Sequence, residues 1–385
     1  MNAVQALARL RFFLREPNAA RFADADLLDL LNEGFLSAAR QSFCLEREVL
    51  LPATNKIAVY PLVKILPDFL AAKRVAWRDF VIDNFDDLDR AALSSYAYQA
   101  PTSTEVTRWS FQDGNLILHP PPTVTTYAGA TVTVTRDSTT VAVTAGNPVT
   151  GGVGVGWLFG VGASPTKWYA VKEVAAASIE LQTPYREETA AGSASLQTSG
   201  AIRLLYAALP AKLRLFADPG ATIHHYYSQG TVAFTLDSET VPEVAATSWG
   251  LVHGAGQEIG VGTMAAKPRL WVKVRQRVSA TSLRLWNPWP IESTGTVNYL
   301  LTDQSPFAPN EERSLVAVYH AAAAAWAGVE EGEKMARQYQ VMYEQELVRV
   351  KQDVGKEETR ETQGVVRIAK PYHPFFGGRV IPRGN

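Results

Sequence analysis

The sequence contains a single cysteine, Cys44, among its 385 residues, so a disulfide within the chain is impossible and a reducing compartment is expected. It has no uninterrupted apolar run of about 18 residues, the length that a membrane-spanning helix needs. Neither sign of charge dominates: 37 basic residues stand against 38 acidic ones, which argues against a protein that coats nucleic acid by bulk attraction. Arg9, Arg11 and Arg15 interrupt the apolar N-terminal stretch, which is therefore predicted to be a helix and not an export signal.

The sequence also lacks the common motifs of enzymes. It has no Gly-x4-Gly-Lys-Ser/Thr loop, no His-Glu-x-x-His and no paired-cysteine metal motif. The glycines within residues 151–156 do not have dinucleotide-binding spacing and are interpreted as a flexible connector. We favour structural over catalytic or metal-binding roles for the remaining candidates: Cys44, the neighbours His224 and His225, and the pairs Asp24 with Asp26 and Glu239 with Glu243. The prediction is a protein that is not an enzyme and that has no cofactor and no metal.

The N-terminal region is predicted to be a helical hairpin. Apolar residues three and four apart indicate a first helix over residues 2–15. A second helix is expected from Asp24, with Leu27, Leu31 and Phe35 on one apolar stripe. Asp24 is expected to cap the first exposed amides of this helix.

The C-terminal region is also predicted to be helical. Residues 311–353 favour helix almost throughout, with a break expected at Gly328 or Gly332. The apolar stripes of these helices contain the following residues: Leu315, Tyr319, Ala322, Trp326, Tyr339, Tyr343, Leu347 and Val350. The helices of the two ends are expected to pack on each other, because neither group buries enough surface alone.

The middle of the chain is predicted to be rich in short strands. Asp113-Gly114-Asn115, between two apolar runs, indicates a β-hairpin, and residues 88–96 are expected to form a short helix. From residue 124 the alternation of threonine and valine over 131–135 and 140–143 indicates a small barrel or sandwich. A second β-rich stretch follows over residues 214–300.

The predicted fold class is α+β, with a discontinuous α-helical bundle as the core and two inserted all-β modules. The predicted segments, in chain order, are these: 1–123, the helical hairpin and β-hairpin part of the core; 124–199, an inserted small β-barrel; 200–213, a return strand of the core; 214–300, a second inserted β module; 301–354, the C-terminal helices of the core; and 355–385, an extended C-terminal arm.

Two aromatic groups are candidates for binding. Trp249, Trp271, Trp286 and Trp289 cluster in the second β-rich stretch, where we favour a place in the core over stacking on sugars or bases. The arm has no acidic residue after Glu361. We favour docking on a protein neighbour over nucleic-acid binding for its basic and aromatic side chains: Arg367, Lys370, Tyr372, Phe375, Phe376 and Arg379.

Residues 21–34, RFADADLLDLLNEG, resemble the second-helix signature of tailed-bacteriophage head-to-tail adaptor (connector, head-completion) proteins. Further segments resemble the same family in the same order: LILHPPP at 116–122, LLYAALP at 204–210, and the C-terminal helix from Leu315 followed by MARQY at 335–339. Together these segments cover about half the chain. The departures are the two β-rich stretches; the first is similar to small β-barrel modules of phage tail and adaptor proteins, and the second matches no module.

The resemblance implies a structural protein of the virion neck, assembled in the host cytoplasm. Such adaptors form a ring, here expected to be a dodecamer, beneath the portal protein and extend the DNA channel toward the tail. The resemblance implies that genomic DNA passes through without sequence-specific binding, and that the β modules face tail-tube, nozzle, collar or fibre proteins. No membrane is involved. Two alternatives stay open: a tail-tube or baseplate component, and a carbohydrate-binding or depolymerising tail protein.

Overall fold

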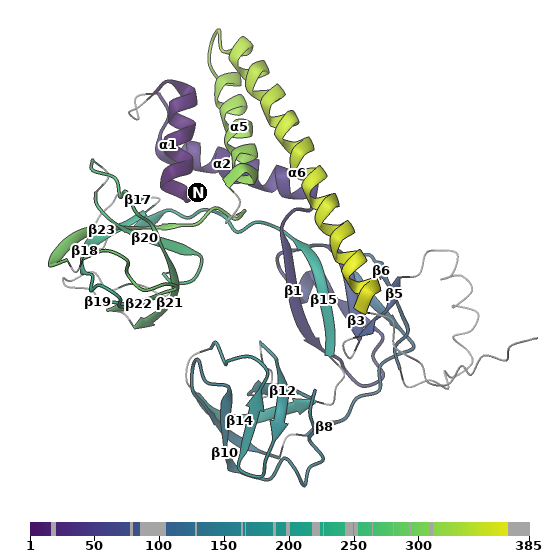
Figure 1. Cartoon of the computed structure of the whole chain (residues 1–385). Coiled ribbons are helices and arrows are strands. Elements are labelled where there is room, and N and C mark those ends of the chain that lie inside the picture. The colour runs from purple at the N-terminus through teal and green to yellow at the C-terminus, as the bar shows by residue number, and fades with distance from the viewer. Residues whose placement is uncertain are drawn as a thin grey trace, which may run out of the picture. The chain divides into compact units, whose positions relative to one another are not determined.

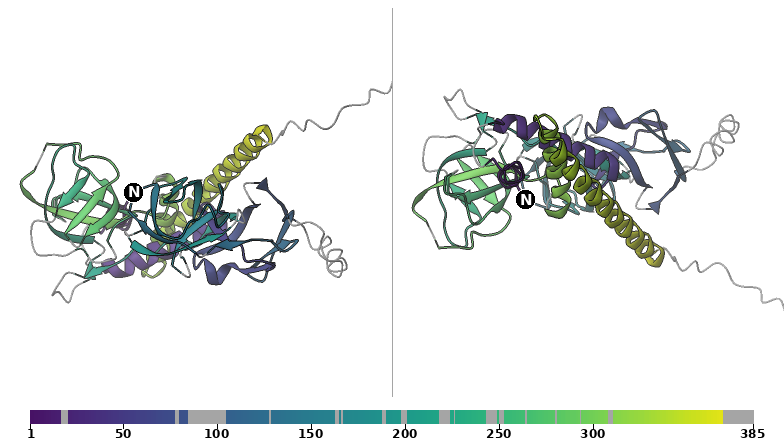
Figure 2. Two further views of the ribbon diagram at one scale, coloured as in Figure 1. Left: turned by 90° about the horizontal axis from the view of Figure 1, so that it is seen from below. Right: turned by 90° about the horizontal axis from the view of Figure 1, so that it is seen from above.

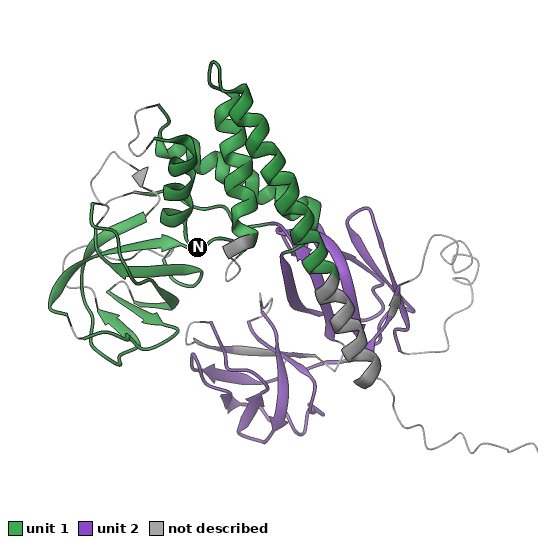
Figure 3. Cartoon of the chain, turned by 45° about the horizontal axis from the view of Figure 1, so that its top comes forward, with its two compact units in different colours: residues 1–44, 210–385 green, residues 45–209 purple. Residues whose placement is uncertain are grey.

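A computed structural model gives the fold of the chain (Figure 1). It describes residues 1–16, 21–77, 80–84, 105–127, 129–162, 165, 167–187, 190–197, 201–217, 224–225, 227–242, 249, 253–263, 265–279, 281–292, 294–307 and 311–368, without the side chains of residues 83, 190, 193–195, 197, 217, 224, 225, 311, 312 and 356–368. The chain divides into two compact units, one of residues 1–44 with 210–385 and one of residues 45–209 (Figure 3). The predicted helix at 88–96 lies outside the described residues.

The first unit contains helices from both ends of the chain: α1 (Ala3–Leu14), α2 (Asp24–Ser42), α5 (Glu311–Ala327) and α6 (Glu333–Ile368). α1 begins with a capping box, in which Asn2 and Gln5 each bond the other's backbone N–H through their side chains. α2 starts at Asp24 as predicted, but Ala23 is its N-cap, and the Asp24 carboxylate instead pairs with Arg11 of α1. α5 contacts α1, α2 and α6, so the N-terminal and C-terminal helices lie against one another.

The first unit also contains a six-stranded antiparallel sheet in the order β18-β23-β20-β21-β22-β19. Its strands are β18 (Tyr227–Ala233), β19 (Thr240–Pro242), β20 (Gln257–Val261), β21 (Val272–Ser279), β22 (Ser282–Leu285) and β23 (Thr296–Asp303). We call residues 227–303 the second β module. Its core includes Phe234, Trp249, Ile259, Trp289 and Tyr299. A separate ladder pairs β16 (Phe216–Ala217) with β17 (His224–His225).

The second unit contains two four-stranded sheets, ordered β1-β15-β3-β4 and β2-β7-β6-β5, which share one hydrophobic core. Their elements are β1 (Glu46–Pro52), β2 (Val59–Pro61), α3 (Leu62–Ile65), β3 (Phe69–Trp77), β4 (Phe80–Val81), β5 (Asp83–Asn84), β6 (Arg108–Gln112), β7 (Asn115–His119) and β15 (Ala201–Ala208). The predicted hairpin is confirmed as β6–β7, and both Asp113 (φ 49°) and Gly114 (φ 80°) have the positive φ of a tight turn.

The second unit also contains a barrel, residues 126–197, which we call the first β module. Its strands are β8 (Thr126–Tyr127), β9 (Thr131–Val134), β10 (Thr140–Ala145), β11 (Leu158–Val161), β12 (Tyr169–Val174), β13 (Ser178–Leu181) and β14 (Ala190–Gln197). They pair in the order β11-β12-β13-β10-β9-β14, and β14 returns to β11 and closes the barrel. Alternate residues such as Val132, Val134 and Val141 fill its interior, as the threonine–valine alternation predicts.

The predicted fold class is wrong. Among the described residues strand outweighs helix, and a helical-bundle core with inserted β modules is not what the structure has. The reason lies in residues 45–123 and 200–209, which were assigned to the helical core. The described residues of these segments form two sheets around their own apolar core, with Trp77, Trp109 and Leu204 inside, and belong to a unit separate from the helices.

The C-terminal segment also differs from the prediction. Helix α6 is 36 residues long and continues to Ile368, so the segment 355–385 is not extended from its first residue (Figure 2). Residues 356–363 are glutamate, lysine, threonine, arginine and glutamine, and most of these types favour helix without any apolar period to reveal it.

The two β modules have the same strand order. β9 to β14 of the first correspond in turn to β18 to β23 of the second, and the ladders β10–β13, β12–β13, β11–β12, β11–β14 and β9–β14 all have counterparts. The same irregularity interrupts β12 between Val171 and Glu173 and β21 between Val274 and Gln276. One ladder differs: β9 pairs with β10 in the first module, whereas no ladder joins the described residues of β18 and β19, their counterparts in the second.

The sequences of the two modules are most alike at a turn whose backbone conformation restricts the choice of residue. Residues 131–141 (TVTVTRDSTTV) and 231–241 (TVAFTLDSETV) are identical at seven of eleven positions. In both turns an aspartate has positive φ (63° and 59°), and the serine that follows donates its hydroxyl to a threonine carbonyl, at 3.0 and 3.1 Å. The aspartates are Asp137 and Asp237, and the serines are Ser138 and Ser238.

A second shared segment is Gly-Val-Gly, at 160–162 and 260–262. A Cβ on Gly160 would lie 2.4 Å from a carbon of Pro165, and one on Gly260 would lie 2.6 Å from the same carbon of Pro268. Only glycine lets the proline ring rest on the strand in either module. The second β module, which matched nothing at the level of sequence, is therefore a second copy of the first.

Candidate interaction surfaces

The predicted stripe on α2 is buried. Leu27 and Leu31 are fully buried, and Phe35 packs edge-to-face on Phe307, with ring centroids 5.3 Å apart. Gly34 lies on the same side and meets α5 closely, because a Cβ at this position would be 2.6 Å from the carbonyl oxygen of Ala317. The residues of the adaptor-like segment thus serve helix packing.

The stripe predicted on α5 is only partly right. Leu315, Tyr319 and Trp326 are half-buried. The fully buried apolar side chains are Val316, Ala317, Val318, Ala321 and Ala322, because α5 contacts helices on several sides and small residues let them approach.

The stripe predicted on α6 is buried, and two of its tyrosines reach the N-terminal helices. The Tyr339 hydroxyl donates to the carbonyl of Phe13 at 3.1 Å. The Tyr343 hydroxyl lies 3.0 Å from the hydroxyl of Ser37 and accepts from the Gln41 amide at 2.9 Å. Leu347 is also buried. These contacts fix the long C-terminal helix to residues at the N-terminal end of the chain.

Helix α6 also has a face that the described residues leave exposed. Val341 is 51% exposed and Val348 is 52% exposed, seven residues and thus about two helical turns apart. Charged and amide side chains surround them, and all of these are exposed: Lys334, Arg337, Gln338, Glu344, Gln345, Arg349 and Gln352. We call these nine residues the α6 outer face.

A groove of about 300 Å³ lies between α5 and α6. It is lined by Ala323, Ala324, Ala336, Arg337 and Gln340 among others, with His320 at one side. Burial lowers the pKa of His320, and the nearby Glu33 carboxylate opposes this in part.

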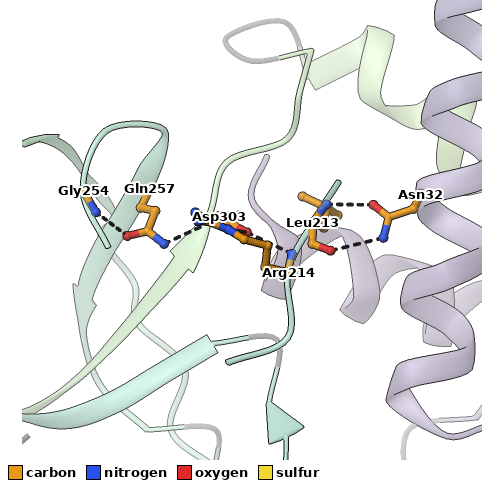
Figure 4. Close-up of polar contacts among 6 residues, drawn as sticks. All are labelled: Asn32, Leu213, Arg214, Gly254, Gln257 and Asp303. Carbon is orange, nitrogen blue, oxygen red and sulfur yellow. Dashed lines mark hydrogen bonds and ion pairs between the residues drawn. The ribbon is translucent and has the colours of Figure 1, made fainter. Parts of the chain in front are cut away.

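A polar network joins the second β module to the helices (Figure 4). The buried Asp303, at the end of β23, accepts from the backbone N (2.9 Å), Nε (3.0 Å) and Nη2 (2.7 Å) of Arg214, and from the Gln257 amide (3.0 Å). The hydrogen bond with Asp303 raises the pKa of Arg214. Next to Arg214, the backbone N–H and C=O of Leu213 bond the side-chain amide of Asn32 on α2. Both carboxylate oxygens of Asp303 accept hydrogen bonds, and the network serves to attach the second β module to the helices.

A second joint lies at the start of α1. Asn2 is fully buried and donates its amide to Glu258 of β20 at 2.9 Å. Glu258 also accepts from Gln304 at 2.7 Å, and Ser305 donates its backbone N–H to the carbonyl of Met1. The second β module is thus fixed to the helices at two points.

Two of the candidates for chemistry, Asp24 and Glu239, have structural partners, and Asp26 is exposed. Asp24 pairs with Arg11, Glu239 pairs with Arg284 at 2.9 Å, and Cys44 is buried. Glu243 and the side chains of His224 and His225 lie outside the description. Among the described residues no three His, Cys, Asp or Glu side chains gather in a way that would hold a metal ion.

The four tryptophans of the second β module divide into two groups. Trp249 and Trp289 are core residues, and Trp271 is half-buried. Trp286, by contrast, is 55% exposed. The preference for the core is right for two of the four, and the sequence gives no signal that separates Trp286 from the others.

The structure brings the helix residues of the prediction together, and it does not test the predicted docking residues of the arm. Lys370, Tyr372, Phe375, Phe376 and Arg379 lie outside the described residues. Arg367 lies in α6, and its side chain is also outside the description.

No protein-family model matches the chain, and no curated protein is significantly similar to it. Within the described residues, no helix combines the length and apolar content that a membrane crossing requires.

Proposed function

We propose that this chain is a structural protein of a bacteriophage neck, a head-to-tail adaptor that forms a ring under the portal protein. Its partners are further copies of itself, the portal, and a tail, collar or fibre protein, and genomic DNA passes through the ring. The observation that carries the proposal is the packing of the adaptor-like helix α2 on α5 and α6. It supports the proposal because two of the segments that resemble the adaptor family, residues 21–34 and the C-terminal helices from Leu315, meet in one unit although they are far apart in the sequence.

A ring needs a heterologous interface, in which one patch on each subunit binds a different patch on the next. The α6 outer face supplies one such patch. Val341 and Val348 are its apolar centre, and its charged rim keeps the isolated chain soluble. The arm beyond α6 is the proposed contact with the portal or with a neighbour, through Phe375 and Phe376.

The test is the native mass of the purified chain, alone and mixed with the portal ring of the same phage. A monomer of 42.0 kDa that joins the portal, with one copy per portal subunit, is the expected result. A closed ring that forms without the portal also supports an adaptor. Failure to associate with the portal in either form would refute the proposal.

Two variants locate the ring interface. The double change Val341→Glu and Val348→Glu should abolish ring formation and change the urea midpoint little, because about half of each side chain is already exposed. Val155→Glu, at an exposed position of the first β module, is the matched control and should assemble normally. Normal assembly of the double variant would place the interface elsewhere.

A further inference from the structure

The duplication of the β module allows one copy to be compared with the other, position by position. Directly paired residues of a ladder share a face. On the outer face of the second module, Trp286 donates its backbone N–H to Lys273 at 2.9 Å. The equivalent pair in the first module is Gln182 and Ala170, joined by the same bond at 2.8 Å. The backbone is the same, and the two side chains have changed to a tryptophan and a lysine.

The neighbouring positions also change: Glu239 and Glu258 stand where the first module has Thr139 and Leu158, and two further positions are both cationic in the second module. In the first module Lys172 binds Glu180 at 2.6 Å, so the two charges cancel. Their counterparts in the second module are Arg275 and Arg284, which are both cationic. We call Lys273, Arg275, Arg284 and Trp286 the basic–aromatic face.

The basic–aromatic face is organised by contacts on the protein's own side. Glu239 binds the Arg284 guanidinium at Nε (2.9 Å), and the Arg275 guanidinium carbon lies 5.7 Å from the centroid of the Trp286 ring. Guanidinium groups present several donors in a planar fork that suits phosphate oxygens. Arg275 thus supports an indole ring that remains more than half exposed.

From this face we infer a binding site for single-stranded nucleic acid in the second β module. Lys273, Arg275 and Arg284 bind backbone phosphates, and an unpaired base stacks on Trp286. Single strands fit better than duplex, because a base must leave its stack to reach an indole ring. They also fit better than an acidic glycan, because two guanidinium groups beside an aromatic ring match phosphate and base together. This proposal does not depend on the proposed adaptor ring, and the two are tested by separate experiments.

The binding test measures the anisotropy of a fluorescent oligothymidylate mixed with the full chain at low salt. Trp286→Gln and Lys273→Ala each restore the residue of the first module. We expect Trp286→Gln to weaken binding about tenfold, and Lys273→Ala to reduce the salt dependence by about 0.7 in the slope of log K against log salt. Gln182→Ala, at the matched position of the first module, should leave the affinity unchanged.

The reverse exchange is a test of gain. The triple change Ala170→Lys, Glu180→Arg and Gln182→Trp transplants the face onto the first module and should raise the number of oligonucleotides bound from one to two. Circular dichroism and the urea midpoint report whether each variant is folded. The proposal is overturned if the unaltered chain does not bind the oligonucleotide, if the Trp286 and Lys273 variants bind as it does, or if only duplex DNA or an acidic polysaccharide such as polygalacturonate binds.

Discussion

Replacing Gly34 by alanine is expected to destabilise the protein, although the same change stabilises most exposed helix positions. Gly34 lies in the middle of α2, where glycine costs about 1 kcal/mol of helix stability relative to alanine. Glycine is nevertheless needed inside a helix where a neighbouring element lies too close to leave room for a side chain. The neighbour here is the backbone of Ala317 on α5.

The size of the effect follows from the distances. A Cβ on Gly34 would lie 2.6 Å from the oxygen and 2.9 Å from the Cα of Ala317, whereas carbon contacts are comfortable at about 3.5–4 Å. Backbone atoms cannot rotate away, so α2 and α5 must separate by about 1 Å and loosen the packing of Leu31 and Phe35. Overpacking of this kind costs about 1–3 kcal/mol, and we expect its upper range to outweigh the propensity gain, for a net loss of about 2 kcal/mol.

The assay is the urea midpoint followed by circular dichroism, with Gly355→Ala as the matched control. Gly355 lies in α6, and a Cβ there meets nothing within 4 Å, so this change should stabilise the helix by up to about 1 kcal/mol. Gly34→Val should lose more than Gly34→Ala, because its side chain is larger. If Gly34→Ala instead gains stability as Gly355→Ala does, the close crossing of α2 and α5 is wrong.

Three further changes probe other parts of the molecule. Asp303→Asn should lower the free energy of unfolding by about 2 kcal/mol, because Arg214 loses charged hydrogen bonds, and thermal melting should show the loss. Ser138→Ala and Ser238→Ala should each lower the free energy of unfolding by about 1 kcal/mol, because the two turns have the same hydrogen bond. A large difference between the urea midpoints of the two variants would argue against the equivalence of the turns. The lowered pKa of His320 means that the unfolded chain binds a proton more readily, so stability should fall as pH drops through about 6.5. His320→Gln should flatten this fall in melts between pH 7 and pH 5, and an unchanged slope would contradict the assignment.

Local features were predictable where one short pattern decides the structure. The hairpin at Asp113-Gly114 and the helix break between Gly328 and Gly332 are where the sequence places them, because glycine and aspartate act through their own backbone. The stripe on α2 was also predictable, since one face of that helix is buried. On α5 the pattern failed, because an alanine-rich helix surrounded by neighbours has no single apolar face.

The fold class was not predictable from the same patterns. Strands β1, β3 and β15 join segments more than a hundred residues apart, and nothing local to Leu51 or Ile202 shows that they pair. The repeat of the β module did have a signal, since Thr-Val and Asp-Ser-x-Thr-Val recur one hundred residues apart. Trp286 had none, because its exposure depends on a strand register that only the fold supplies.

The packing of α2 on α5 has a consequence for the order of events on the ribosome. At about 5–20 residues per second, on the order of 15–60 s pass between the synthesis of Gly34 and that of Ala317. The strands of both β modules are synthesised during this interval, and each module has its own core. Leu27 and Leu31 meanwhile lack α5, the helix on which α2 packs in the finished unit. The order of synthesis thereby delays completion of the helical unit until α5 and α6 have left the exit tunnel.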